Sequence, residues 1–260
     1  MTVKPWAERG PFLAANIRPK DRHELSQGNA IYCAPTGGSG ARGTGYGFAV
    51  IDSDPLVESA GVDAGFSPEP GTLRAPDVSV GVPDREGWIA VVPPLALEYA
   101  GGSQDEESLQ RKIADLLDAG TRWVWVIRLL GPRRVEVYEP GREPVLYGPG
   151  AALTAPGVLQ NPVPVEALWD RAAAHDLTLN NLLARAGYKS LDAVREEGRG
   201  SALAHAVLDV LSARGLAVDD AQRALILGCR EPDRLARWLR RAATLSTSGA
   251  VVDEDETAPV

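Results

Sequence analysis

Hydrophobic residues recur at helical spacing in one stretch of the chain, between residues 103 and 120. The pattern predicts an amphipathic helix, whose apolar stripe consists of Leu109, Ile113, Leu116 and Leu117. Ser103 and Glu106 have the spacing of a capping box at the N-terminal end. Gly120 suits the C-terminal end, where a glycine commonly stops a helix.

Short apolar runs bounded by Gly, Pro and Asp surround this helix and predict strands. The runs cover residues 30–33, 77–82, 95–98, 122–127 and 133–138. Strands therefore precede the helix, and two more follow it. This order indicates an α/β or α+β core.

Residues 36–47 contain six glycines in twelve positions, from Thr36 to Gly47. The pattern argues against a phosphate-binding loop, because no Gly-Lys-Ser/Thr ending follows. Glycine weakens a helix by about 1 kcal/mol per residue relative to alanine. The segment is therefore expected to be a flexible loop or a weakened helix.

The composition changes near residue 163, where Gly and Pro become rare and Ala, Leu and Arg dominate. Helices are predicted near 163–175, 177–186, 201–214, 218–229 and 232–244. We expect a mixed domain over residues 1–170, a helical extension over 171–245 and a disordered acidic tail over 246–260.

Charge and cysteine content restrict the classes of function. The net charge is −8, whereas proteins that bind DNA through bulk electrostatics are usually basic. Cys33 and Cys229 lie far apart, so a zinc site is not indicated. The N-terminus lacks a signal-peptide pattern, and no apolar run approaches the ~20 residues of a membrane helix. The expectation is a cytoplasmic protein that does not associate with a membrane.

Three polar residues suggest chemistry. Asp77 begins one predicted strand, Glu98 ends another, and Lys112 lies on the flank of the helix. Two carboxylates are sufficient protein ligands for Mg²⁺, and a nearby ammonium could orient a water or stabilise a transition state. A structural role is the alternative: a turn at Asp77, a solvated Glu98, and a contact of Lys112 with Ser108 or Asp115.

The sequence resembles the Uma-two family, which comprises bacterial restriction-endonuclease-like proteins of the PD-(D/E)XK fold. The resemblance covers about residues 12–170. Its most specific piece is the Pro-Asp strand over residues 73–80. Further along the chain, residues 95–98, 112–120 and 123–127 match the family at the level of pattern, and residues 23–31 and 35–38 match more weakly. The implied fold is a mixed central sheet flanked by helices, with a small all-α extension after it.

The resemblance also implies a site and a reaction. Asp77 and Glu98 would bind Mg²⁺ or Mn²⁺, Lys112 would assist catalysis, and Glu24 would be an accessory acid. The implied function is a Mg²⁺-dependent DNA endonuclease, and such nucleases often act as homodimers.

The chain departs from the family pattern beside the acids. Ala100 stands where the standard motif has lysine, and Gly101 and Gly102 replace the usual Ser-Pro. The alternative function is therefore a catalytically weakened nuclease-fold protein that serves as a binding or interaction module. A general α/β protein with structural carboxylates is a third hypothesis.

Overall fold

The computed structural model of this protein describes residues 7–8, 10–18, 21–101 and 105–253. Two compact units divide the chain, one ending at Ala186 and the other beginning at Gly187. The first contains all the strands, and the second is helical.

A six-stranded mixed sheet forms the centre of the first unit, in the order β4-β5-β6-β7-β8-β9. Only the β6–β7 pair is parallel among these strands. The bounds are Ala60–Val62, Val78–Val80, Leu95–Ala100, Trp123–Arg128, Arg134–Tyr138 and Val145–Tyr147 for β4 to β9. The parallel pair is connected through α2 (Glu106–Asp118), the expected crossover for parallel neighbours.

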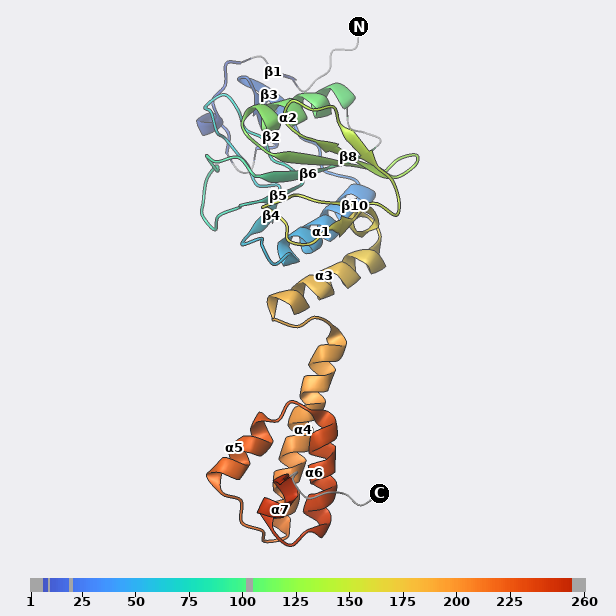
Figure 1. The fold of residues 1–260 in the computed structure, drawn as a ribbon. Coiled ribbons are helices and arrows are strands. Elements are labelled where there is room, and N and C mark those ends of the chain that lie inside the picture. The colour runs from blue at the N-terminus through green and yellow to red at the C-terminus, as the bar shows by residue number, and fades with distance from the viewer. Residues whose placement is uncertain (1–6, 9, 19–20, 102–104, 254–260) are drawn as a thin grey trace. The chain divides into compact units, whose positions relative to one another are not determined.

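Side chains alternate between the two faces of this sheet, as the two-residue period of a strand requires. Leu95, Leu97 and Tyr99 of β6 belong to the core beneath α1 (Gly38–Ser53). Ala96 and Ala100 of the same strand pack with the apolar stripe of α2. Figure 1 shows α2 on one side of the sheet and α1 on the other. The predicted mixed sheet flanked by helices is thus confirmed.

Smaller sheets complete the first unit. β1 (Ala7–Glu8), β3 (Asn29–Tyr32) and β2 (His23–Ser26) form an antiparallel sheet in that order. β10 (Ala152–Leu153) pairs with β11 (Val163–Pro164). Leu25 of β2 also exchanges two backbone hydrogen bonds with Leu73, at 2.9 and 3.0 Å. This bridge ties the small sheet to the segment that leads into β5.

Of the two forms expected for the glycine-rich segment, a flexible loop or a weakened helix, the structure has a helix: residues 38–47 form the first part of the continuous helix α1. Gly43 and Gly47 lie against the Tyr99 ring, leaving no room for a side chain there. Close packing of the helix on β6 therefore requires glycine at these positions, and tertiary contact offsets the low helix propensity.

The boundary between the units lies later than the expected position at residue 170. Helix α3 (Arg171–Arg185) belongs to the first unit because it packs on α1. Buried Asn181 donates to Val50 O and Ser53 Oγ, and Arg185 donates to the carbonyl oxygens of Asp52, Asp54 and Val57 near the end of α1. The region expected as two helices over 163–186 contains β11, a 3₁₀ helix over Val165–Leu168, and α3.

The second unit consists of α4 (Leu191–Ala213), α5 (Asp220–Gly228), α6 (Pro232–Thr244) and α7 (Ser248–Val252). Its core includes Leu211, Leu235 and Trp238. The tail expected to be disordered from residue 246 instead forms α7, because Val251 and Val252 are buried in this core. Residues 254–260 of that tail lie outside the described residues.

Two local predictions, one at the start of α2 and one at β6, also differ from the structure. Ser103 of the proposed capping box lies outside the described residues, and the N-cap is Asp105. Glu98 lies within β6 rather than at its end, because the strand continues to Ala100. Within the described ranges, no helix is long and apolar enough to cross a membrane.

The α1 contact with Tyr99 predicts opposite effects of two alanine substitutions. The Cβ of Gly43→Ala would lie 2.6 Å from the Tyr99 ring, so overpacking should lower the free energy of unfolding by about 1–3 kcal/mol. The matched control Gly45→Ala meets no atom within 4 Å and should raise it by up to about 1 kcal/mol. Urea unfolding measures both. Equal stabilisation by the two variants would contradict the packing account.

Candidate active site

Strand register places Asp77 opposite Glu98. Val78 of β5 pairs with Leu97 of β6, and Ser79 pairs with Ala96. Asp77 immediately precedes β5, so extending this register by one position sets it opposite Glu98, and Asp77 Oδ2 accepts a hydrogen bond from the N–H of Tyr99, the next residue of β6. Opposed residues of antiparallel strands project from the same face with Cβ atoms about 4.5–5.5 Å apart. The two acids expected to act together are therefore neighbours on the sheet face that α2 covers.

Lys112 reaches this face from α2. Its Nζ lies 2.8 Å from Glu98 Oε1 and 3.1 Å from Glu24 Oε1, and it donates to Ala75 O at 2.7 Å. The helix buries the lysine because position 112 directly precedes the apolar Ile113, and the long stem carries the ammonium inward. The inward orientation expected from the sequence is thus observed. The proposed contact with Asp115 is not, because Asp115 pairs with Arg74.

Glu24 comes from β2 and joins Lys112 to Arg74. Arg74 Nη1 donates to Glu24 Oε2 at 2.9 Å, and the Ala75 N–H donates to Glu24 Oε1 at 3.3 Å. Burial alone would raise the pKa of Glu24, but Lys112 and Arg74 together hold it below its ordinary value. Glu24 is therefore ionised and serves as the shared anion of two buried cations.

Burial is the main influence on Glu98, which is 1% exposed. It raises the pKa of Glu98 to about 8, against the opposing effect of Lys112 and with a further upward contribution from Asp77. Lys112 Nζ pairs with Glu98 Oε1 at 2.8 Å, and this contact opposes the effect of burial on the Glu98 carboxyl.

The Asp77 carboxylate has one fixed and one available oxygen. Oδ2 accepts from the Tyr99 N–H at 2.6 Å, and no hydrogen bond from another described residue reaches Oδ1. Burial raises the pKa of Asp77, while Lys112 and the Tyr99 N–H act in the opposite direction. The Tyr99 side chain points to the other face of the sheet, where its hydroxyl donates to Leu168 O at 3.0 Å.

The residues present fit a hard divalent cation. Asp77 and Glu98 supply the carboxylate oxygens that Mg²⁺ and Mn²⁺ prefer, and they come from neighbouring segments of one sheet face. Within the described ranges, no three His, Cys, Asp or Glu side chains are arranged to hold a metal together. The cation that fits is therefore one that keeps several waters, as Mg²⁺ usually does.

Sequence reasoning missed three residues around the site: Arg74, Asp115 and Asp63. Arg74 and Asp115 form the other half of the buried network, with Nη2 2.5 Å from Oδ2. Asp63 directly follows Val62 of β4, which pairs with Val78 of β5, and its negative charge contributes to the raised pKa of Asp77. The sequence signal that could have identified Arg74 was its position two residues before the Pro76-Asp77 pair. No such signal pointed to Asp63, because strand β4 was not predicted.

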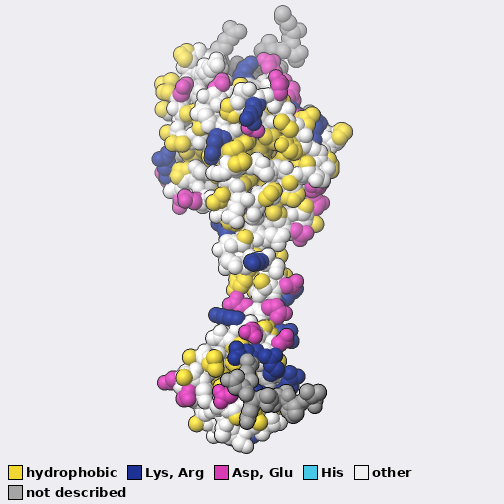
Figure 2. Space-filling view, viewed as in Figure 1, with side chains coloured by type: hydrophobic (Ala, Val, Ile, Leu, Met, Phe, Trp, Pro, Cys, Tyr) yellow, Lys and Arg dark blue, Asp and Glu magenta, His cyan; other side chains and the backbone are white. Residues whose placement is uncertain are grey.

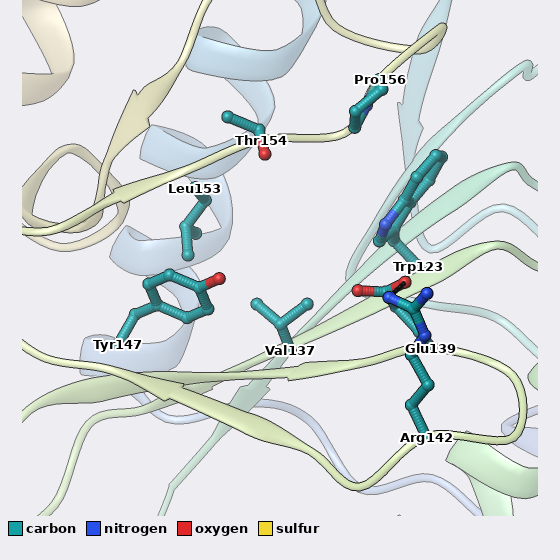
Figure 3. Close-up of a pocket in the computed structure, with 8 residues that line it drawn as sticks. All are labelled: Trp123, Val137, Glu139, Arg142, Tyr147, Leu153, Thr154 and Pro156. Carbon is teal, nitrogen blue, oxygen red and sulfur yellow. Dashed lines mark hydrogen bonds and ion pairs between the residues drawn. The ribbon is translucent and has the colours of Figure 1, made fainter.

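A separate cavity of about 230 Å³ lies on the opposite face of the sheet (Figure 3). Trp123, Val137, Tyr147 and Leu153 line it and belong to the core on the α1 side. Glu139 and Arg142 at its edge pair with each other at 3.1 Å. The sheet separates this cavity from the acids and from Lys112, so it is not part of the candidate site.

Comparison with known proteins identifies the fold. No protein-family model and no curated protein matches this sequence. A solved structure from Anabaena variabilis ATCC 29413, described as a putative nuclease belonging to DUF820, matches with a TM-score of 0.53 and 20% sequence identity. The match covers 63% of this chain and 99% of that chain. At this identity the likeness establishes a shared fold.

The buried network predicts a pH-dependent cost for Glu24→Gln. The substitution leaves Lys112 and Arg74 without their shared anion, so it should cost about 3 kcal/mol of unfolding free energy near pH 7. Because the two cations depress the pKa of Glu24 below its ordinary value of 4.5, this contribution is complete above that value. It is lost as pH falls through the lower pKa of the folded state.

Urea unfolding of wild type and variant between about pH 3 and pH 7 measures this difference. The control is Glu107→Gln, which breaks an exposed pair with Arg111 and should change stability by less than about 0.5 kcal/mol at any pH. A Glu24→Gln effect as small as that of the control would contradict the network.

Proposed function

We propose that the first unit is a metal-dependent nuclease that hydrolyses phosphodiester bonds in DNA, with Mg²⁺ or Mn²⁺ as cofactor. One observation carries the proposal: strand register sets Asp77 opposite Glu98, and Lys112 Nζ lies 2.8 Å from Glu98 Oε1. Two acids and a lysine on one face are a combination suited to phosphoryl chemistry.

Each residue has a distinct role in this proposal. Asp77 and Glu98 hold the cation, which when bound would neutralise phosphate charge and lower the pKa of a bound water. Lys112 orients the attacking water or stabilises charge on the phosphate. Glu24 keeps the Lys112 ammonium charged and fixed, because Glu24, Glu98 and Asp77 raise the pKa of Lys112 despite its burial.

The shared fold supports the same reaction. The matching structure is described as a putative nuclease, and we extend that activity to this chain as part of the proposal. The proposal also includes membership of the Uma-two family, which the sequence resemblance suggests. The fit of Asp77 and Glu98 to a hard cation is the independent support from this chain's own geometry.

A second candidate function is a binding module with weakened catalysis. Because position 100 is alanine, Lys112 is the lysine beside the acids among the described residues, and three acceptors already surround its ammonium. In the second unit, α6 contains four arginines and one acid over Pro232–Thr244. Figure 2 shows Lys and Arg side chains gathered on that unit. Such a surface favours an acidic partner, either a nucleic acid or an acidic protein.

Plasmid cleavage tests the nuclease proposal. With Mg²⁺ or Mn²⁺ present, wild type should convert supercoiled DNA to nicked or linear forms, and chelation should abolish the conversion. Asp77→Asn should lower the rate roughly 100-fold or more, because it removes a charged ligand from the site.

Asp84→Asn is the matched control, since Asp84 is an exposed acid outside the network and its loss should leave cleavage unchanged. Equal cleavage by wild type and Asp77→Asn would overturn the proposal. Cation binding by wild type without cleavage would favour the binding-module alternative.

The raised pKa of Glu98 predicts that cation affinity increases with pH. A carboxyl group must lose its proton to bind a metal, and the pKa of about 8 keeps Glu98 mostly protonated near neutrality. Affinity for Mn²⁺ should therefore rise between about pH 6.5 and pH 8, by up to about tenfold per pH unit, and then level off. Calorimetric titration measures it. An affinity independent of pH over this range would contradict the assignment of Glu98 as a ligand.

A further inference from the structure

Arg74 occupies the centre of the buried network, and neither the sequence resemblance nor the reaction proposed above assigns it a role. Its side chain is 3% exposed. Nε and Nη2 donate to Asp115 Oδ2 at 2.9 and 2.5 Å, and Nη1 donates to Glu24 Oε2 at 2.9 Å. The planar guanidinium therefore bridges two carboxylates from different elements, β2 and α2.

The backbone of Arg74 is fixed as firmly as its side chain. Arg74 and Phe66 exchange two backbone hydrogen bonds of 2.8 and 2.9 Å. A guanidinium loses little freedom when it forms a hydrogen-bonded fork, because its donors are pre-arranged in one plane. Arg74 is thus a rigid reference point directly beside the segment that leads to Asp77.

Apart from Glu98, each group that holds Lys112 in place is either bound by Arg74 or belongs to Ala75, the next residue. Asp115 lies one turn beyond Lys112 on the same helix, so the clamp on Asp115 sets the position of α2 against the sheet. Glu24 receives Arg74 on one oxygen and Lys112 on the other. The third acceptor of the ammonium is the carbonyl oxygen of Ala75, the next residue along the chain.

We propose that Arg74 is the positioning residue for Lys112: by clamping Asp115 and Glu24 it places the ammonium against Glu98 and Asp77. The catalytic consequence rests on the proposed function, whereas the placement of Lys112 does not. Lysine at position 74 would keep the charge but could not reproduce a planar fork to two carboxylates. Arg74→Lys should therefore release Lys112 while leaving the acids and the cation site in place.

The chain provides a matched control at Arg128. This arginine also bridges two carboxylates, Glu106 of α2 at 2.7 Å and Glu136 of β8 at 2.9 Å. It restrains the first turn of the same helix without contacting a partner of Lys112. Arg128→Lys should therefore loosen α2 to a comparable degree but leave the ammonium in place.

Lysine reactivity tests the placement without requiring enzymatic activity. The chain has four lysines, Lys4, Lys20, Lys112 and Lys189. An amine-acylating reagent followed by peptide mass spectrometry gives the labelling rate of Lys112 relative to the exposed Lys189. Arg74→Lys should raise this ratio at least tenfold in the folded protein, and Arg128→Lys should leave it within twofold of wild type. An unchanged ratio in Arg74→Lys, or an equal rise in both variants, would overturn the proposal.

Cleavage kinetics test the catalytic consequence. Arg74→Lys should lower kcat at least tenfold with little change in the KM for DNA or in the Mn²⁺ affinity. Combined with Lys112→Met it should cause no further loss, because both changes remove the same group. Additive losses would overturn the assignment. Absence of cleavage by wild type would refute the proposed function instead, and the labelling ratio would still decide whether Arg74 places Lys112.

Discussion

The buried ammonium of Lys112 is the constraint on which the arrangement of the first unit depends. A charge removed from water is costly unless other groups pair with it and accept its hydrogen bonds. Glu24, Glu98 and Ala75 O meet that need from three different segments. Strand β2, strand β6, the lead-in to β5 and helix α2 must therefore meet at one point for the charge to be tolerated.

The polar cluster and the main core lie on opposite faces of the central sheet, because successive side chains of a strand point to opposite faces. Glu98 points toward α2, while its neighbours Leu97 and Tyr99 point into the core beneath α1. Tyr99 links the two faces, because its backbone N–H binds Asp77 and its ring fills the space left by the α1 glycines. Tyr99 therefore contacts both the α1 glycines and the Asp77 carboxylate.

Two separate features support the proposed nuclease function: the shared fold and the chemistry of the candidate site. The fold is shared with a structure described as a putative nuclease, at 20% identity, and this likeness establishes architecture alone. The chemistry comes from the site, where Asp77 and Glu98 are adjacent in register and Lys112 lies beside them. The buried Glu98, whose pKa is raised to about 8, is the kind of perturbed acid that gathers at functional sites.

The sequence by itself indicated part of the local structure and the main residues of the candidate site. Periodic apolar residues indicated α2, β6, β7 and β8, and residue chemistry identified Asp77, Glu98 and Lys112 as candidates that could act together. Glu24 came from the family resemblance. These signals are local, because side-chain period and residue type are written into short stretches of chain.

The tertiary structure decided whatever depends on contact between distant segments. It made a helix of the glycine-rich segment because α1 needed close approach to Tyr99, and it kept α3 in the first unit through Asn181 and Arg185. It also revealed Arg74 as the link between β2 and α2, separated by 50 residues from Glu24 and 41 from Asp115. Such contacts have no local pattern in the sequence, since their energy appears only when the segments meet.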